Sequence, residues 1–253
     1  MDLWTATPDQ LRTALVDSGL HRAYLVTDPE SGEIRTSHEL LASLAHALAE
    51  GCTDYHGHQA AFFEVGADSG HLLSAWVHKT VRGQAAGGVR LWPYDTVEQF
   101  ARDGLRLSRG MGHKNALAGL WWGGGKGVIA RRPGVDHRDP EMRRKIYQDY
   151  GRFMTGLRGC YVTAEDAGTT SDDMAWIHST TRHATCIPVS VGGSGNPSVL
   201  TAKGVVVAME AALDWLGKGA LEGKTVVMQG LGNVSFYMIG DLLERRVGRI
   251  IGS

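Results

Sequence analysis

Two lysines flank a glycine-rich segment, and together they could support acid–base chemistry near neutral pH. Lys126 directly follows the glycine triplet 123–125, and Lys114 lies twelve residues earlier. A lysine that is desolvated near another cation has a lowered pKa, so it can act as a general base. The glycines would leave bare backbone against which a small substrate can pack. Two solvated surface lysines are the alternative, which suits Lys114 better than Lys126.

A phosphate-binding P-loop is a second interpretation of the same segment. That motif needs G-x-x-x-x-G-K followed by Ser or Thr. Here position 120 is Leu and position 127 is Gly, so the match fails at both places. The sequence therefore disfavours an NTPase.

Asp166 follows a short predicted strand and precedes a glycine turn. An acid in that position could point into a cleft and act as a proton donor. Acids beside a helix start are also common helix caps, and that role suits Asp172 and Asp173 within the predicted capping box at 170–173. We therefore take Asp166 as the catalytic candidate of this segment.

The segment 230–235 reads G-L-G-N-V-S between a Val-rich predicted strand and a predicted helix. Such glycines make a tight turn and let a pyrophosphate approach the backbone at a helix N-terminus. Ser235 stands where a third glycine or alanine is usual, and an ordinary strand–helix turn is the alternative. The acidic residue that would separate NAD from NADP would fall at or beyond Ser253, so this segment does not distinguish them. The cofactor we expect is NAD, and NADP stays open. The cofactor-binding candidates in this segment are Gly230, Gly232, Asn233 and Val234.

The elements that must position these residues follow from periodicity and capping signals. Helices are predicted at 7–18, 37–50 and 201–215, after the caps at 95–96, 139 and 170, and after Gly232. Strands are predicted at 62–65, 72–79, 160–163, 224–228 and 249–252. Glycine clusters at 83–88, 123–127 and 192–197 interrupt these elements, and the third is the best candidate for a linker between domains.

Composition excludes several classes of protein. The chain has 253 residues, 34 of them glycine, and a 43% apolar fraction that can build a core. Lysines and arginines number 26 against 27 acids, so nucleic-acid binding is not expected. The three cysteines imply no disulfide framework and fit a reducing cytosol. Without a signal-peptide pattern or a long apolar run, we expect a cytoplasmic protein with no membrane segment. The histidines at 56 and 58 lack a third ligand, so no metal site is expected.

Together these segments resemble the glutamate/leucine/phenylalanine/valine dehydrogenase family, the amino-acid dehydrogenases that release ammonia. The resemblance extends from about Phe62 to Ser253, whereas residues 1–60 look like a variable N-terminal region. It implies an α/β fold in which a substrate and dimerisation domain at 1–190 precedes the start of a Rossmann-type NAD(P)-binding domain at 191–253. The matching blocks, in the family's order, are 87–91, 105–115, 123–126, 163–170 and 192–201, leading to the glycines at 230 and 232.

The resemblance also implies roles for individual residues. Lys126 matches the family's catalytic lysine, Lys114 matches the lysine that binds the substrate carboxylate, and Asp166 matches the aspartate of proton transfer and amine binding. Thr201 matches a threonine near the nicotinamide. The implied reaction is oxidative deamination of an L-amino acid by a homo-oligomer.

Substrate choice can be partly inferred. The paired glycines Gly87 and Gly88 would line the substrate site. Glutamate-specific members of the family carry a lysine just before this pair, whereas the present chain has Ala86. Alanine cannot pair with a side-chain carboxylate, so an apolar substrate of the leucine, valine or phenylalanine type is expected.

The alternative is a truncated, non-catalytic homologue that keeps the oligomerising substrate domain. A dinucleotide-binding sheet needs more strands than residues 191–253 provide. We therefore expect that the chain is truncated at its C-terminal side and has little activity if made as written.

Overall fold

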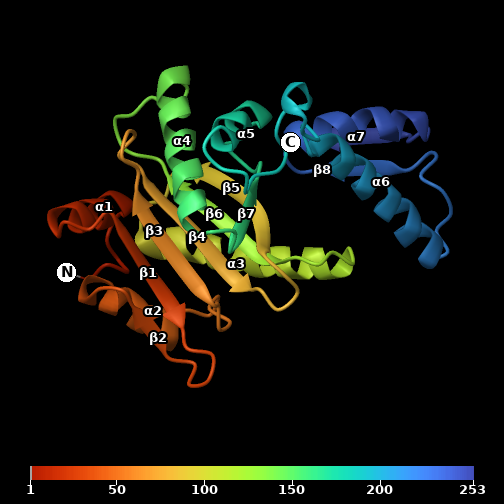
Figure 1. Ribbon diagram of the computed structural model, residues 1–253. Coiled ribbons are helices and arrows are strands. Elements are labelled where there is room, and N and C mark those ends of the chain that lie inside the picture. Colours follow the sequence, from red (N-terminus) through yellow and green to blue (C-terminus); the bar gives the residue numbers. More distant parts are fainter. Residues whose placement is uncertain (1) are drawn as a thin grey trace. The chain divides into compact units, whose positions relative to one another are not determined.

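The computed structural model describes residues 2–253 and separates into two compact units (Figure 1). The first ends at Gly195 and the second spans Asn196–Ser253. The division falls inside the glycine cluster at 192–197. Each unit has its own hydrophobic core.

In the described part of the first unit, seven strands form one mixed sheet in the order β2-β1-β3-β4-β6-β5-β7. The pairs from β2 to β6 are antiparallel, whereas β5 runs parallel to both β6 and β7. This parallel part places the carboxyl end of β7 near the middle of β5. The strands are β1 (Arg22–Thr27), β2 (Ile34–Thr36), β3 (Ala60–Val65), β4 (Leu72–Lys79), β5 (Ala85–Trp92), β6 (Gly123–Ala130) and β7 (Tyr161–Ala164).

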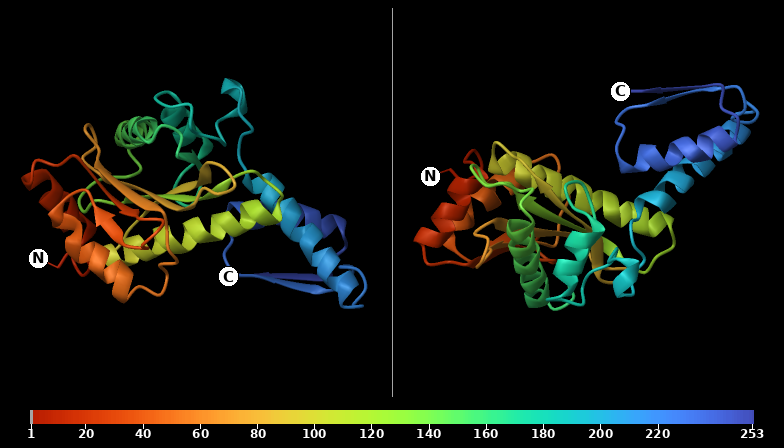
Figure 2. Two further views of the ribbon diagram at one scale, coloured as in Figure 1. Left: turned by 60° about the horizontal axis from the view of Figure 1, so that its bottom comes forward. Right: turned by 90° about the horizontal axis from the view of Figure 1, so that it is seen from above.

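Helices cover both faces of this sheet, with α3 along one face and α4 and α5 against the other (Figure 2). The helices are α1 (Pro8–Asp17), α2 (Ala42–Glu50), α3 (Val97–Leu117), α4 (Pro140–Gly156) and α5 (Ser171–His178), with 3-10 turns η1 (Glu39–Leu41) and η2 (Val189–Val191). The core on the α3 side also takes residues from α1 and α2, including Leu11, Leu15, Leu44, Leu48, Phe100 and Leu105. The opposite core includes Ile146, Tyr147, Tyr150, Phe153, Met174 and Ile177.

Local capping signals predicted the starts of α1, α4 and α5 correctly, whereas the helix predicted at 37–50 begins only at Ala42, after the 3-10 turn η1. Thr7 and Gln10 form a capping box at the start of α1, and Thr170 and Asp173 form another at the start of α5. Asp139 accepts hydrogen bonds from two backbone N–H groups at the start of α4. These side chains satisfy backbone donors that have no partner inside the helix.

Strands β5 and β6 differ from the sequence prediction, which treated their glycines only as clusters that interrupt the elements. Glycine has a low strand propensity because it has no side chain to pack. Here close packing compensates: a Cβ on Gly125 would lie 2.5 Å from the ring of Tyr161, and one on Gly124 would lie 2.6 Å from the backbone N of Gly112 in α3. The glycines let a helix and an aromatic ring approach the strand closely. The short strands β1 and β2 were also missed.

The second unit is a strand–helix–strand arrangement preceded by a long helix. Strands β8 (Thr225–Met228) and β9 (Arg249–Gly252) pair in parallel, and α7 (Asn233–Glu244) connects them. Helix α6 (Ser198–Trp215) begins three residues before the predicted start at 201. The buried core comprises Ala202, Val206, Leu221, Val226, Met228, Met238 and Leu242.

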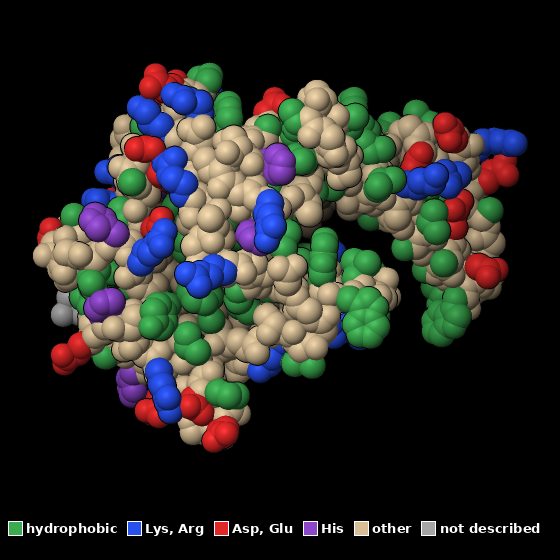
Figure 3. Space-filling model, in the orientation of Figure 1, with side chains coloured by type: hydrophobic (Ala, Val, Ile, Leu, Met, Phe, Trp, Pro, Cys, Tyr) green, Lys and Arg blue, Asp and Glu red, His purple; other side chains and the backbone are tan. Residues whose placement is uncertain are grey.

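The surface carries both signs of charge. Acidic and basic side chains are interspersed on the face in Figure 3, in keeping with a net charge of −1. No helix within residues 2–253 combines the length and apolarity that a membrane span requires.

Candidate active site

Lys126 and Asp166 lie in direct contact at the parallel part of the sheet. Nζ of Lys126 forms an ion pair with Oδ2 of Asp166. Lys126 lies within β6 with a side chain that is only 3% exposed, and Asp166 follows β7 with a side chain that is 20% exposed. The two catalytic candidates, forty residues apart in the sequence, therefore meet in one partly open site.

Gly88 leaves the space in which this pair forms. The parallel register of β5 and β6 pairs Val89 with Gly127, which places Gly88 beside Lys126. A Cβ on Gly88 would lie 2.7 Å from Cβ and 2.9 Å from Oδ2 of Asp166. Any side chain at this position would therefore push Asp166 away from its present place.

The loop after β7 fixes the backbone of Asp166. The backbone N–H of Asp166 donates to Oγ1 of Thr169 (2.7 Å), and the Thr169 hydroxyl also lies 3.2 Å from the carbonyl oxygen of Val89 in β5. Oδ1 of Asp166 accepts from the N–H of Ala167 (2.5 Å). The loop is thus tied to the strand that carries the paired glycines.

A guanidinium and a second carboxylate extend the ion pair. Arg90 in β5 donates through Nη2 to Oδ1 of Asp166 (3.4 Å) and through Nη1 to both oxygens of Asp103 in α3 (3.1 and 3.0 Å). The hydroxyl of Tyr94 donates to Oδ2 of Asp103 (2.6 Å). Sequence reasoning gave none of these three residues a role. The one available signal was the position of Arg90, two residues after Gly88 and thus on the same strand face.

Burial lowers the pKa of Lys126 to about 7, and the positive charges of Arg90 and Lys114 act in the same direction. The negative charge of Asp103 opposes this shift and raises the pKa. The shift is downward because a buried ammonium loses its hydration. A neutral amine is therefore accessible near pH 7, as a general base requires.

The remaining substrate-site candidates lie around this pair. Lys114 is exposed in the last turn of α3 and contributes to the field at Lys126. Ala86 is buried in β5 and pairs with Gly124 of β6. A Cβ on Gly87 would lie 2.9 Å from Cγ of Met111, so this glycine allows α3 to pack closely.

The glycine turn of the second unit leaves open space at the start of α7. Gly230 has a positive φ of 87°, which favours glycine, and Gly232 is the N-cap of α7. A Cβ on either glycine would meet no heavy atom within 4 Å. Asn233 and Val234 occupy the first turn of the helix. This bare helix N-terminus suits the phosphates of a dinucleotide.

Ser235 has a local structural role that explains its departure from the usual glycine or alanine. Its hydroxyl donates to the carbonyl oxygen of Gly230 (2.7 Å) and so closes the turn. Thr201 lies in the exposed part of α6 and donates to the carbonyl oxygen of Pro197 (2.9 Å). Both hydroxyls stabilise their own backbone segments.

The histidines at 56 and 58 do not form a metal centre with other side chains. Nε2 of His58 donates to the carbonyl oxygen of Leu105 (2.9 Å), and burial lowers the pKa of His58 to about 3. Among residues 2–253, no group of three histidine, cysteine or acidic side chains is arranged to hold a metal ion.

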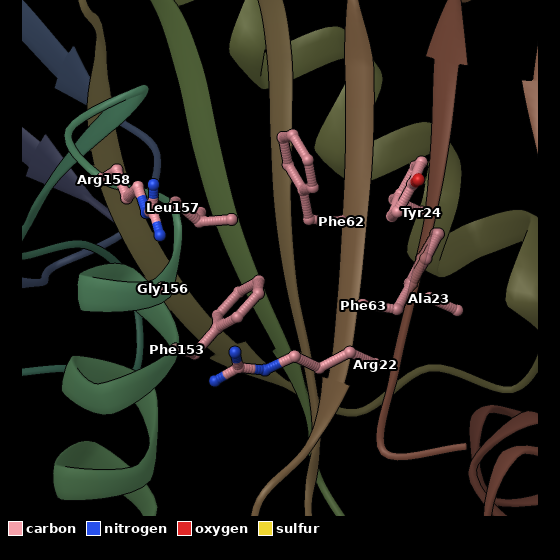
Figure 4. A pocket seen from close by; sticks show the side chains of 9 residues that line it. All are labelled: Arg22, Ala23, Tyr24, Phe62, Phe63, Phe153, Gly156, Leu157 and Arg158. Atoms are coloured by element: carbon pink, nitrogen blue, oxygen red, sulfur yellow. The ribbon is translucent and has the colours of Figure 1, made fainter. Parts of the chain in front are cut away.

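A separate cavity of about 330 Å³ lies between β1, β3 and the end of α4 (Figure 4). Apolar side chains such as Phe62, Phe153 and Leu157 line it, together with Arg22 and Arg158. It contains none of the predicted site residues, so the candidate active site lies elsewhere.

Two parts of the chain match known protein families. Residues 59–183 match the family described as Glu/Leu/Phe/Val dehydrogenase, dimerisation domain. Residues 192–252 match Glutamate/Leucine/Phenylalanine/Valine dehydrogenase. The chain belongs to the Glu/Leu/Phe/Val dehydrogenase family. The resemblance inferred from the sequence blocks is therefore confirmed.

Curated members of the Glu/Leu/Phe/Val dehydrogenase family are similar in sequence to this chain. The leucine dehydrogenase of Bacillus subtilis is 44% identical over 176 residues, which cover 69% of this chain and 47% of the relative. The valine dehydrogenase of Streptomyces virginiae is 40% identical over 195 residues, which cover 76% of this chain and 52% of the relative. The chain thus spans about half the length of the curated relatives it matches.

Solved structures of amino-acid dehydrogenases confirm the α/β fold. The L-tryptophan dehydrogenase of Nostoc punctiforme has a TM-score of 0.55 and 31% identity, covering 76% of this chain and 54% of that one. A hetero-hexameric glutamate dehydrogenase from Thermus thermophilus has a TM-score of 0.63 over 91% of this chain and 49% of that one. Its 24% identity supports the fold alone.

Proposed function

We propose that the protein is an NAD-dependent dehydrogenase that oxidatively deaminates an apolar L-amino acid to the 2-oxo acid and ammonia. The observation that carries this proposal is the buried Lys126, whose pKa is lowered to about 7, in contact with Asp166. A neutral amine beside a carboxylate can move protons to and from water and a leaving amine near neutral pH.

Three residues of this chain would have separate roles in the reaction. Lys114 would pair with the substrate carboxylate and orient Cα. Neutral Lys126 would take a proton from the water that attacks the iminium carbon, and the Asp166 carboxylate in contact with it would relay a proton to the departing amine. The nicotinamide, when bound, supplies the hydride acceptor.

The segment at the start of α7 would hold the cofactor. Gly230 and Gly232 would admit the pyrophosphate to the bare backbone, and the N–H groups of Asn233 and Val234 would face it. Thr201 would approach the nicotinamide end, as the family resemblance implies. The open space around both glycines fits such a ligand. We propose NAD, rather than NADP, as the cofactor.

An apolar substrate is supported by Ala86. This residue is buried in β5 and offers no charge to a side-chain carboxylate. Glutamate would then bury an unpaired carboxylate, which is costly, whereas leucine, valine or phenylalanine would bury only apolar surface. The relatives named for leucine and valine accord with this choice.

We also propose the roles of the two parts of the chain. Residues 1–190 would form the substrate-binding and dimerisation domain, and residues 191–253 would belong to the NAD(P)-binding domain. The matching description "dimerisation domain" supports assembly with further copies of the chain. The three cysteines are free thiols, which suits the reducing cytoplasm that we propose as the compartment.

The direct test is NADH formation by the full-length gene product with a panel of L-amino acids. We expect turnover with leucine, valine or phenylalanine and little with glutamate. Lys126→Ala should lower kcat by about 10²–10⁴, the range typical of a lost general base. Arg35→Gln, which breaks a surface ion pair with Asp28 on the far edge of the sheet, is the matched control and should keep its activity. Undiminished turnover in Lys126→Ala, or glutamate as the preferred substrate, would overturn the proposal.

A further inference from the structure

The two oxygens of the Asp166 carboxylate have different partners, and only Oδ2 pairs with Lys126. Oδ2 pairs with Lys126, whereas Oδ1 accepts from the backbone of Ala167 and from Nη2 of Arg90. The Ala167 contact comes from the adjacent residue of the same loop. Arg90 is therefore the group from another element that holds Oδ1 of Asp166.

We propose that Arg90, anchored by Asp103 and Tyr94, is a positioning residue that holds Asp166 against Lys126. The kinetic part of this inference rests on the proposed function, whereas its structural part concerns the side chains alone. Arg90 would touch no reacting atom. It would act by fixing the place and the charge of the carboxylate that does.

The anchor of Arg90 is stronger than its contact with Asp166. Nη1 reaches both oxygens of Asp103, at 3.1 and 3.0 Å, while Nη2 is 3.4 Å from Asp166. Burial raises the pKa of Tyr94, and the Asp103 carboxylate raises it further, so the phenol stays protonated and donates to Asp103. Helix α3 and the segment after β5 thus hold the guanidinium in place independently of its contact with Asp166.

While Arg90 bridges two carboxylates, its Nε is buried and has no hydrogen-bond partner within the described residues. A buried unpaired donor is costly and calls for an explanation. In this orientation the two Nη atoms reach two different carboxylates while Nε reaches none.

The charges around Lys126 come from three elements that pack near it. Arg90 lies on β5, Asp103 and Lys114 lie on α3, and Asp166 lies on the loop after β7. Arg90 lowers the pKa of Lys126, and Asp103 raises it. The two halves of one ion pair therefore act on Lys126 in opposite directions.

A merely structural ion pair between β5 and α3 is the competing explanation. Loss of either partner would then destabilise the fold and act on Lys126 only through its charge, while Asp166 stays in contact with Lys126. The positioning role instead predicts that Asp166 loses most of its effect on the pKa of Lys126 when Arg90 is lost. Titration of Lys126 by NMR in chain labelled with ¹³C at the lysine side chains separates the two, because it needs no turnover.

We expect Asp166→Asn to lower the pKa of Lys126, since a contacting negative charge is removed. In the Arg90→Gln background the same substitution should lower it much less, because Asp166 would no longer lie against Lys126. Arg35→Gln removes a remote, exposed arginine on β2 and is the matched control, in which the effect of Asp166→Asn should be unchanged. Lys126→Met assigns the resonance, and thermal unfolding of each variant reports whether it folds. If Arg90→Gln does not fold, Asp103→Asn, which removes the anchor of Arg90, takes its place. An equal effect of Asp166→Asn with and without Arg90 would overturn the proposal.

Kinetics of the full-length gene product give the second readout. Arg90→Gln should lower kcat at least tenfold with a smaller change in KM. Arg90→Lys should restore most of kcat. If the unaltered protein shows no turnover, the proposed function fails while the NMR titration still decides the role of Arg90.

Discussion

At the residue scale, the site combines groups that the sequence could indicate with groups that it could not. Lys126 and Asp166 stand out by residue type beside glycines, and the structure brings them into contact. Asp103 and Tyr94 carry no local signal, because they reach the site only when α3 and the end of β5 fold together. Long-range charge contacts depend on the packing of elements, which spacing in a single sequence does not specify.

The pH dependence of catalysis follows from Lys126. Its pKa is lowered to about 7, chiefly by burial, and the neutral form is the active base. Activity should therefore rise as the pH increases through about 7, because the ammonium form dominates below that value. The measurement is kcat/KM against pH for the full-length gene product. An acidic limb near pH 10 would show that Lys126 titrates as an ordinary lysine.

Gly88 offers a test of the close approach between the strand and the loop. A Cβ at this position would lie 2.6 Å from the carbonyl oxygen of Glu165 and 2.7 Å from Cβ of Asp166. Gly88→Ala should displace the loop, lower kcat and cost about 1–3 kcal/mol of unfolding free energy, as overpacking does. Gly110→Ala is the matched control, since its added Cβ meets nothing within 4 Å. Equal behaviour of the two variants in activity and denaturant unfolding would contradict this reading.

At the element scale, capping was predictable and the glycine-rich strands were not. Thr7 and Thr170 signal helix starts through contacts within three residues, so a local sequence window contains the necessary information. The glycine-rich segments form strands β5 and β6 because Tyr161 and helix α3, from distant parts of the chain, pack against them. A local propensity that argues against a strand was outweighed by tertiary packing.

The cap of α3 supports the site at a distance. Thr96 accepts a hydrogen bond from the backbone N–H of Gln99 (3.2 Å) at the start of the helix that carries Asp103 and Lys114. Thr96→Ala should cost about 1 kcal/mol, the usual loss for such a cap. Thr96→Ser keeps the oxygen and should retain most of the stability. Tm values from thermal unfolding compare the variants, and an unchanged Tm in Thr96→Ala would refute the assigned role.

At the scale of the whole molecule, the two units differ in how well their sheets are covered. Strands β4 and β6 lie inside a seven-stranded sheet, whereas β8 pairs only with β9 among the described residues. Val227 in β8 is 72% exposed. A two-stranded sheet is marginally stable by itself and depends on packing against helices.

Amide hydrogen exchange of the 253-residue chain should reflect this difference. We expect residues 225–228 to exchange faster than residues 123–130, since local stability follows buried packing. Mass spectrometry of peptides from both regions measures the two rates in one sample. Equal protection would mean that the two units open in a single cooperative step.

The central claim is that Lys126 supports deamination of an apolar amino acid. The most direct measurement incubates the full-length gene product with NAD and L-leucine, L-valine or L-phenylalanine deuterated at Cα, beside the Lys126→Ala variant. We predict deuterated NADH, the 2-oxo acid and ammonia in equal amounts with at least one substrate, and a loss of about 10²-fold or more in the variant. Absence of these products with all three amino acids, or their undiminished formation by the variant, would contradict the account.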